Sequence, residues 1–202
     1  MLELVVVGLG YVGLPLVREA VRSGHHVSGL DSDPAVVAGL ASGRSHVDDV
    51  SDADVAAMLA AGFAPSSDAA VLDSADVVVI CVPTPLDRHG SPDLSAVLGA
   101  GRTVAEHLRP GTLVVLESTS YPGTTEDLLR PLLEESGLVV GTDIHLAFSP
   151  ERIDPGNPQF DLRRTPKVVG GVTPECGRRA GEFYGTVVDE VVMVPRAREA
   201  EL

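Results

Sequence analysis

The first thirteen residues constrain the fold of this chain more than any other stretch. Residues 2–7 form an apolar, β-branched run that predicts a buried strand, and this run continues without a break into the glycine-rich segment Gly8–Gly13. An amphipathic pattern typical of a helix follows from Leu14 and ends near Ser23. The segment reads G-x-G-x-x-G between a strand and a helix, which is the context in which this motif holds the pyrophosphate of a dinucleotide.

Each glycine of the motif has its own expected role. Gly8 allows a tight turn out of the strand, Gly10 lets the backbone approach a pyrophosphate, and Gly13 lets the helix pack closely on the sheet. The phosphates would lie at the helix N-terminus, because its N–H groups and its dipole favour negative charge.

An acidic residue completes the pattern. The run at residues 26–30 predicts a second strand and ends in Asp31, about twenty residues past the glycines, where a carboxylate can accept hydrogen bonds from both ribose hydroxyls of adenosine. The same charge would repel a 2′-phosphate, and Ser32 and Asp33 follow with no Arg or Lys to neutralise one. The pattern therefore favours NAD over NADP. The alternative is a purely structural glycine turn with an Asp that caps the next helix.

Composition narrows the class of protein. A chain of 202 residues can form one substantial domain, and its formal net charge of −14 argues against a broad surface for nucleic acid or anionic lipid. No apolar run has the length of a membrane span and no leader pattern precedes the first strand, so we expect a cytoplasmic protein. Cys81, Cys176 and the pair His25-His26 lack the spacing of zinc ligands, so we expect no metal.

Apolar runs alternate with helical patterns along the whole chain. This alternation predicts an α/β fold with a doubly wound, mostly parallel sheet of the Rossmann type. Besides the elements already named, we expect strands at residues 77–82, 113–116, 144–148, 168–169 and 191–194, and helices at residues 35–40, 52–61, 94–108, 124–135 and 174–184.

Ligands of such sheets bind outside the carboxyl ends of the strands, where the strand order reverses. This rule selects the loops Gly8–Gly13, Val82–Thr84 and Ser118–Thr119, and Ser149–Glu151 follows a later strand. All four loops carry groups suited to a cofactor or substrate.

Three of these loops also have simpler interpretations. Pro83 and Pro85 stiffen the chain. The segment after the strand could therefore be a rigid connection and nothing more, and would then not present the Thr84 hydroxyl to a ligand. The hydroxyl-rich stretch 118–125 could merely cap the helix that follows it. Glu151 by itself would more often be a solvated surface charge than a catalytic group.

Taken together, the segments resemble the UDP-glucose/GDP-mannose dehydrogenase family in its N-terminal, NAD-binding domain. The resemblance covers nearly the whole chain in family order, and the combination of SHVDDV with SPERIDPGN is most similar to the branch that acts on UDP-N-acetylhexosamines. The matching stretches are VVGLGYVGLPL, GLDSDPAVV, GRSHVDDV, ADVVVICVPTPL, PDLSAV, LRPGTLVVLESTSYPGTT, LAFSPERIDPGNP and TPKVVGG.

The resemblance implies a reaction. Enzymes of this family oxidise the primary alcohol at the sixth carbon of a nucleotide sugar to a carboxylate and use two NAD⁺ per turnover. A cysteine captures the intermediate aldehyde as a thiohemiacetal, a second hydride transfer leaves a thioester, and water hydrolyses it. A thiolate thus divides one four-electron oxidation into two hydride transfers.

The resemblance also implies roles for individual residues. Catalytic roles fall to Thr119 and Glu151, with Glu151 orienting the catalytic water or assisting acid–base steps. The UDP-glucose branch has a second glutamate where this chain has Pro155, so that role does not transfer, and Arg152 and Lys167 have no assigned role. The residues implied to bind NAD are Gly8, Gly10, Tyr11, Val12 and Gly13 at the pyrophosphate, Asp31 at the adenosine ribose, Val82, Pro83 and Thr84 beside the cofactor, and Ser118 and Thr119 near the nicotinamide.

Part of the family's machinery has no match here. We expect residues 1–195 to form the NAD-binding domain and residues 196–202 to begin the helix that leads to a central and substrate domain. The family's catalytic lysine, asparagine and cysteine belong to those later parts. Neither Cys81, expected inside a buried strand, nor Cys176, expected in a helix, matches the nucleophile.

Two hypotheses of function therefore stand. In the first, the chain is the NAD-binding part of a nucleotide-sugar dehydrogenase that is homo-oligomeric at full length, and the chain is inactive alone. In the second, it is a natural short protein that binds NAD without catalysis or completes a site with a separate chain. The length of the open reading frame would discriminate them.

Overall fold

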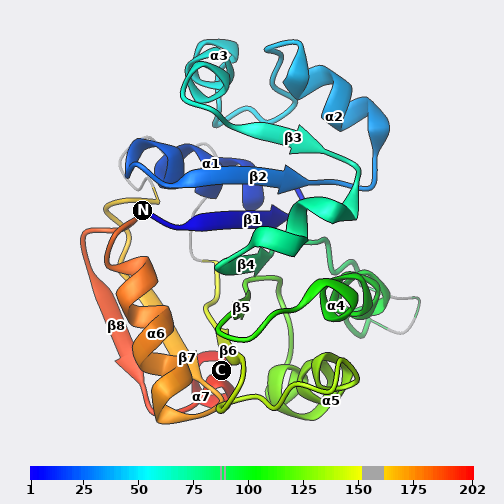
Figure 1. The fold of residues 1–202 in the computed structure, drawn as a ribbon, viewed down its shortest axis with the longest axis vertical. Helices are drawn as coiled ribbons and strands as arrows, with labels where there is room; N and C mark the ends of the chain where they lie inside the picture. The colour runs from blue at the N-terminus through cyan, green and yellow to red at the C-terminus, as the bar shows by residue number, and fades with distance from the viewer. Residues whose placement is uncertain (87, 89, 152–161) are drawn as a thin grey trace.

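The computed structural model describes residues 1–86, 88, 90–151 and 162–202. Within these residues, eight strands form one sheet in the order β3-β2-β1-β4-β5-β6-β7-β8 (Figure 1). This order confirms the predicted doubly wound Rossmann architecture. The strands are β1 (Glu3–Val7), β2 (His26–Leu30), β3 (Ala64–Ser66), β4 (Val77–Ile80), β5 (Leu113–Leu116), β6 (His145–Phe148), β7 (Lys167–Gly171) and β8 (Val191–Val194).

The helix Pro34–Ala41 begins at a capping aspartate. The Asp33 carboxylate accepts the N–H of Ala35 at 2.8 Å, and Pro34, whose missing N–H costs nothing there, occupies the first turn. The described helices are α1 (Gly13–Arg22), α2 (Pro34–Ala41), α3 (Asp52–Ala60), the 3₁₀ helix η1 (Ala69–Ser74), α4 (Ser95–His107), the π-helical turn η2 (Thr124–Leu129), α5 (Arg130–Glu134), α6 (Pro174–Tyr184) and α7 (Ala197–Ala200).

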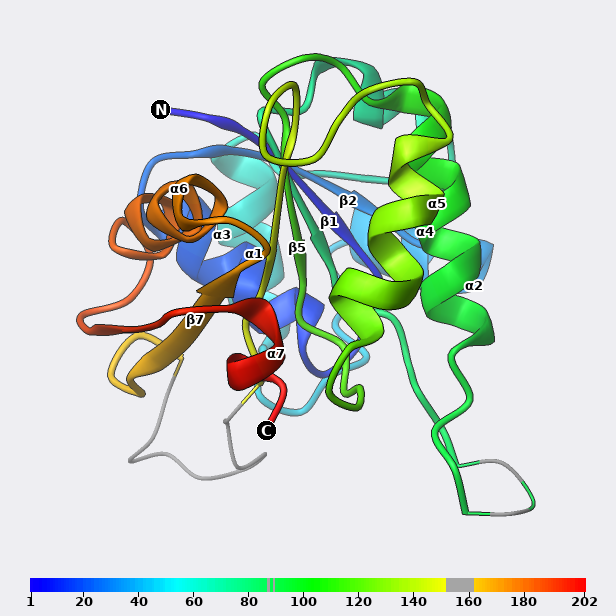
Figure 2. The same cartoon turned by 90° about the horizontal axis from the view of Figure 1, so that it is seen from below.

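Two hydrophobic cores lie on opposite faces of the sheet. α1, α3 and α6 cover one face, and η1, α4, α5 and α7 cover the other. Figure 2 shows α1, α3 and α6 on one side of the strands and α4 and α5 on the other. β4, β5 and β6 are buried along their whole length. β4 and β5 have the unbroken apolar sequences expected of strands covered on both faces, whereas β6 begins with the buried His145.

The direction of the strands changes once along the sheet. β1 to β6 are parallel, whereas β7 pairs antiparallel with β6 in the register Phe148↔Gly170, and β8 runs parallel to β7. The beginning of β7 therefore lies at the same edge as the carboxyl ends of the parallel strands. This orientation brings Lys167, the first residue of β7, to the edge at which ligands bind in such sheets.

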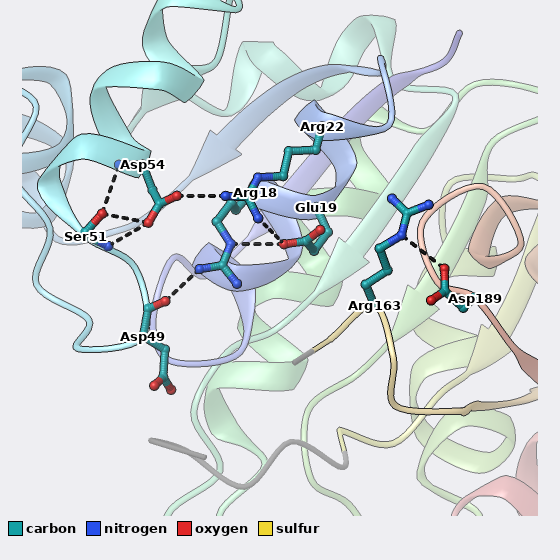
Figure 3. Close-up of polar contacts among 8 residues, drawn as sticks. All are labelled: Arg18, Glu19, Arg22, Asp49, Ser51, Asp54, Arg163 and Asp189. Atoms are coloured by element: carbon teal, nitrogen blue, oxygen red, sulfur yellow. Dashed lines mark hydrogen bonds and ion pairs between the residues drawn. The ribbon is translucent and has the colours of Figure 1, made fainter. Parts of the chain in front are cut away.

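A network of charged side chains fixes α1 against the segment that precedes and begins α3 (Figure 3). The Glu19 carboxylate pairs with both Arg18 and Arg22 at 3.0 Å, and Arg22 reaches Asp54 at 2.9 Å. Arg18 also donates to the carbonyl oxygen of Asp49 at 2.7 Å. Because α1 begins directly after the glycine-rich turn, these contacts help to hold that turn in place.

In the described parts of the chain, no helix is long and apolar enough to cross a membrane. The same residues contain no group of three or more His, Cys, Asp or Glu side chains arranged to hold a metal ion.

Candidate functional site

The four loops selected from the sequence surround one cleft at the carboxyl edge of the sheet. The cleft has a volume of about 450 Å³, and it is lined by every predicted site residue except Gly13. Ser32, Cys81 and Glu117 also line it. The strand order reverses between β1 and β4, and the loops that follow these two strands form the centre of the cleft.

A second cavity of about 540 Å³ adjoins the first. The two cavities share Gly8, Asp31, Ser32, Val82 and Pro83. The second one then continues along α4, where small side chains at positions 96, 99 and 100 leave room. The second cavity is mainly apolar, which fits the aromatic ring of an adenine, whereas the first also carries hydroxyl and carboxyl groups.

The three glycines of the motif meet three different surroundings. Gly8 has φ +93°, and a Cβ there would lie 2.7 Å from the carbonyl oxygen of Cys81, so the turn requires glycine. A Cβ at Gly13 would collide with the carbonyl oxygen of Gly8, which explains the close approach of α1 to the turn. A Cβ at Gly10 would meet no protein atom within 4 Å. The open space at Gly10 fits the close approach of a pyrophosphate to the backbone.

The carboxylate of Asp31 is held at the end of β2. Its Oδ2 accepts the N–H of Leu9 at 2.8 Å, and its Oδ1 accepts the N–H of Asp33 at 2.9 Å. The helix cap belongs to Asp33 and not to Asp31. Because each carboxylate oxygen has two lone pairs, these bonds leave acceptor capacity for ribose hydroxyls. Among the described residues that line the two cavities, none is Lys or Arg.

Ser118 links the loops that follow β4 and β5 by a hydrogen bond. Its hydroxyl donates to the carbonyl oxygen of Val82 at 2.7 Å, and the side chain is buried. Val82, Pro83 and Thr84 therefore lie beside Ser118 along the cleft wall. Thr119, the next residue, is exposed at the cleft.

The helix after the hydroxyl-rich loop is capped from a distant part of the chain. It begins at Thr124 after Gly123, whose φ is +104°, and no side chain of the loop caps it. Instead the Glu201 carboxylate accepts the N–H groups of Gly123 at 2.5 Å and Thr125 at 2.8 Å, together with the Thr125 hydroxyl at 2.6 Å. The loop hydroxyls thus do not have the simple capping role that the sequence left open.

Sequence reasoning missed a buried polar cluster behind the cleft. Lys167 Nζ lies 3.1 Å from Glu117 Oε2 and 3.3 Å from Glu151 Oε2. The Tyr184 hydroxyl donates a short hydrogen bond to Glu117 Oε1, and the ammonium lies 5.6 Å from the centre of the Tyr184 ring. Lys167 and Glu117 are almost completely buried, whereas Glu151 is partly exposed and lines the cleft.

The charges of this cluster depend on one another. Burial alone would lower the pKa of Lys167, but the neighbouring Glu117 and Glu151 carboxylates raise it above its ordinary value, so the ammonium stays protonated. Burial raises the pKa of the Glu117 carboxyl, and the charge of Lys167 opposes that rise. Burial and the charge of Glu117 raise the pKa of the Tyr184 hydroxyl, which therefore remains a proton donor.

The structure places Cys81 differently from what the sequence predicts. It was expected inside a buried strand, but β4 ends at Ile80, and Cys81 is the next residue and lines the cleft. Burial, followed by the charge of Glu117, raises the pKa of its thiol well above the ordinary value, so it is not a thiolate at neutral pH. Cys176 lies in α6, as expected, and is completely buried. Arg152 and Pro155 lie outside the described residues.

Comparison with known proteins agrees with this geometry. Residues 2–188 match the sequence model of the UDP-glucose/GDP-mannose dehydrogenase family, NAD binding domain. Protein CapL of Staphylococcus aureus is 40% identical over 92% of this chain and 43% of its own length. UDP-N-acetyl-D-mannosamine dehydrogenase of Pyrococcus horikoshii is 36% identical over 100% of this chain and 48% of its own length.

A solved structure has the same fold. UDP-D-ManNAc dehydrogenase from Pyrococcus horikoshii superposes with a TM-score of 0.91 at 35% identity, covering 98% of this chain and 48% of that one. The chain therefore spans about half the length of the relatives that it matches. It belongs to the UDP-glucose/GDP-mannose dehydrogenase family, and it corresponds to the NAD-binding domain of that family.

Proposed function

We propose that this chain supplies the NAD site of an enzyme that oxidises the C6 alcohol of a UDP-N-acetylhexosamine to a carboxylate. The observation that carries the proposal is the single cleft in which the glycine-rich turn, Asp31, Thr119 and Glu151 meet. The names of two relatives point to the sugar, because those from Pyrococcus horikoshii and Escherichia coli are both UDP-N-acetyl-D-mannosamine dehydrogenases.

The two cavities suggest how NAD lies. The adenine would occupy the apolar cavity along α4, with its ribose hydroxyls on Asp31. The pyrophosphate would lie against Gly10, Tyr11 and Val12 at the start of α1. The nicotinamide would then lie in the part of the cleft beside Thr119 and Glu151, where, when bound, it would supply the acceptor for a hydride from the sugar carbon.

The proposed reaction balances with water and two cofactors. One alcohol, two NAD⁺ and one water give one carboxylate, two NADH and three protons. We propose that the Glu151 carboxylate positions this water and that the Thr119 hydroxyl holds the water or the sugar oxygen. Cys81 and Cys176 are both buried, so we assign the nucleophilic thiol to the half of the relatives that this chain does not cover.

Three further points belong to the proposal. We take residues 1–195 as the cofactor domain and residues 196–202 as the start of the connection to the substrate domain. We propose that the complete enzyme is a homo-oligomer and that it works in the cytoplasm, where NAD and nucleotide sugars are available. The nucleotide sugar is the expected partner, and the net charge of −14 disfavours nucleic acid.

A chimera tests whether this chain can supply the NAD site of such an enzyme. This chain would replace the matching half of the Pyrococcus horikoshii enzyme, and NADH formation would be followed with UDP-N-acetylmannosamine, UDP-N-acetylglucosamine and UDP-glucose. We expect oxidation of an N-acetylated sugar by the chimera and none by the isolated chain. A chimera that binds NADH but oxidises no UDP-N-acetylhexosamine, or steady-state turnover by the isolated chain, contradicts the proposal.

A further inference from the structure

The buried cluster behind the cleft contains three ionisable side chains to which the proposed function gives no role, namely Lys167, Glu117 and Tyr184. Lys167 is the sole lysine of the chain, and its side chain is 5% exposed. Burial of an ammonium is unfavourable unless opposite charges compensate it. Glu117 alone would neutralise this charge, yet a second carboxylate, Glu151, also lies within ion-pair distance.

The two carboxylates beside the ammonium differ in exposure and in their other contacts. Glu117 follows β5, is fully buried, and receives the hydroxyl of Tyr184, so it forms the inner side of the cluster. Glu151 follows β6 and is 15% exposed at the cleft. The ammonium also lies over the Tyr184 ring, so its position is restricted by three neighbouring groups before any ligand arrives.

We propose that Lys167 is a positioning residue for Glu151, whose carboxylate it fixes at the nicotinamide end of the cleft while Glu117 and Tyr184 fix the ammonium from behind. Lys167 Nζ donates a hydrogen bond to Glu151 Oε2 at 3.3 Å, which restrains one carboxylate oxygen of a side chain carried by a loop. The raised pKa of Lys167 keeps this donor charged throughout the neutral range. The inference rests on the proposed function in one respect, namely that Glu151 faces the nicotinamide.

The contact itself can be tested without any cofactor. Because the chain has one lysine, labelling with [ε-¹³C]lysine gives a single side-chain NMR signal that belongs to Lys167. We expect this signal to move in Glu151→Gln and to stay in place in Glu106→Gln, a matched control at an exposed position of α4. A signal that moves in Glu117→Gln but not in Glu151→Gln overturns the proposal.

The positioning role can be tested by cofactor binding. The nicotinamide ring is cationic in NAD⁺ and neutral in NADH, so a fixed carboxylate beside it favours NAD⁺. We expect Glu151→Gln to lower the ratio of NAD⁺ to NADH affinity by about threefold to tenfold, the range for a partly screened charge. In a Lys167→Met background, Glu151→Gln should change the ratio of NAD⁺ to NADH affinity by less than about twofold. The Glu151 carboxylate is then no longer held by the lysine, so its removal has less effect.

Two further variants distinguish a loss of positioning from a loss of folding in this double-mutant cycle. Lys167→Met leaves Glu117 buried without a counter-charge and so threatens folding, whereas Lys167→Met with Glu117→Gln removes both charges together. Lys167→Arg keeps a cation and should restore the dependence on Glu151. An undiminished Glu151→Gln effect in a folded variant without Lys167 overturns the positioning role. If the unchanged chain binds neither NAD⁺ nor NADH, the proposed function fails, and the lysine NMR signal alone decides the inference.

Discussion

The backbone N–H of Leu9 donates to the Asp31 carboxylate at 2.8 Å, so the glycine-rich turn and the end of β2 are directly linked. The two halves of the cofactor pattern are therefore one structural unit before a ligand binds. A carboxylate that is already oriented loses less side-chain entropy when it accepts ribose hydroxyls.

Replacing Asp31 by Ala should weaken NADH binding by roughly 1–3 kcal/mol, the scale of hydrogen bonds to a charged group. Isothermal calorimetry on the purified chain measures this loss. The matched control is Asp33→Ala, which removes the cap of α2 and should lower the free energy of unfolding by about 1 kcal/mol while leaving NADH affinity nearly unchanged. Equal losses of affinity in the two variants would point to a general effect on the loop.

Gly10 and Gly13 form a pair that separates binding from stability. Gly13→Ala should lower the free energy of unfolding by about 1–3 kcal/mol, because the new Cβ collides with the Gly8 carbonyl oxygen. The new methyl group in Gly10→Ala contacts no protein atom, so the free energy of unfolding should be unchanged. The affinity for NADH should fall by about tenfold or more, because this methyl group occupies the space expected for the pyrophosphate. Urea unfolding and calorimetry on both variants provide the test, and full NADH affinity in Gly10→Ala would exclude the proposed pyrophosphate position.

His25 should make stability depend on pH. Burial, then the nearby N-terminal charge, lowers its pKa below the ordinary 6.5, and its Nδ1 accepts the N–H of Leu2 at 3.3 Å, which a protonated ring cannot do. The unfolded chain therefore binds a proton at higher pH than the folded chain does. The contribution of His25 is fully present above the unfolded pKa and is lost progressively as pH falls from that value through the lower folded pKa. His145 has a pKa that burial lowers in the same direction.

Urea unfolding between about pH 7.5 and about pH 5.5 isolates this contribution. The unchanged chain should lose more stability over this range than His25→Gln does. His46→Gln, at an exposed position, should lose as much as the unchanged chain. Identical slopes in the unchanged chain and His25→Gln would show that the ring keeps its ordinary pKa.

Glu151 should matter more for thioester hydrolysis than for cofactor binding. In the chimera described above, Glu151→Gln should slow turnover and let a covalent sugar adduct accumulate, because the water is no longer positioned. Intact-mass spectrometry after substrate addition detects the adduct, and Glu106→Gln is the control. Unaffected turnover without an adduct would show that Glu151 has no part in the hydrolysis.

Much of the sheet follows from local sequence. The strands at His26–Leu30, Leu113–Leu116 and Val191–Val194 and the helix Pro174–Tyr184 have the predicted bounds, because each has a strong apolar pattern between turn residues. The expected helix at residues 124–135 instead begins with a π-helical turn and becomes α-helical only at Arg130. Its unusual start coincides with capping by Glu201, a long-range contact that no local pattern contains.

The edge strand β3 and the cluster around Lys167 could not be predicted in this way. β3 has three residues with Pro65 at its centre, and such a sequence reads as a loop. Lys167 reaches Glu117 and Glu151 only because β7 runs antiparallel to β6, and a short strand gives no signal of its direction. One signal was present: Glu117 directly follows a buried strand at the edge where ligands bind.

The most direct test of the account is calorimetric titration of the purified chain with NADH and, separately, with NADPH. The account predicts one NADH per chain and an affinity for NADPH that is lower by about tenfold or more, because Asp31 would lie beside the 2′-phosphate and no cation lines the described cavities. Asp31→Ala should narrow this difference by weakening NADH binding. Equal or tighter binding of NADPH by the unchanged chain would contradict the account.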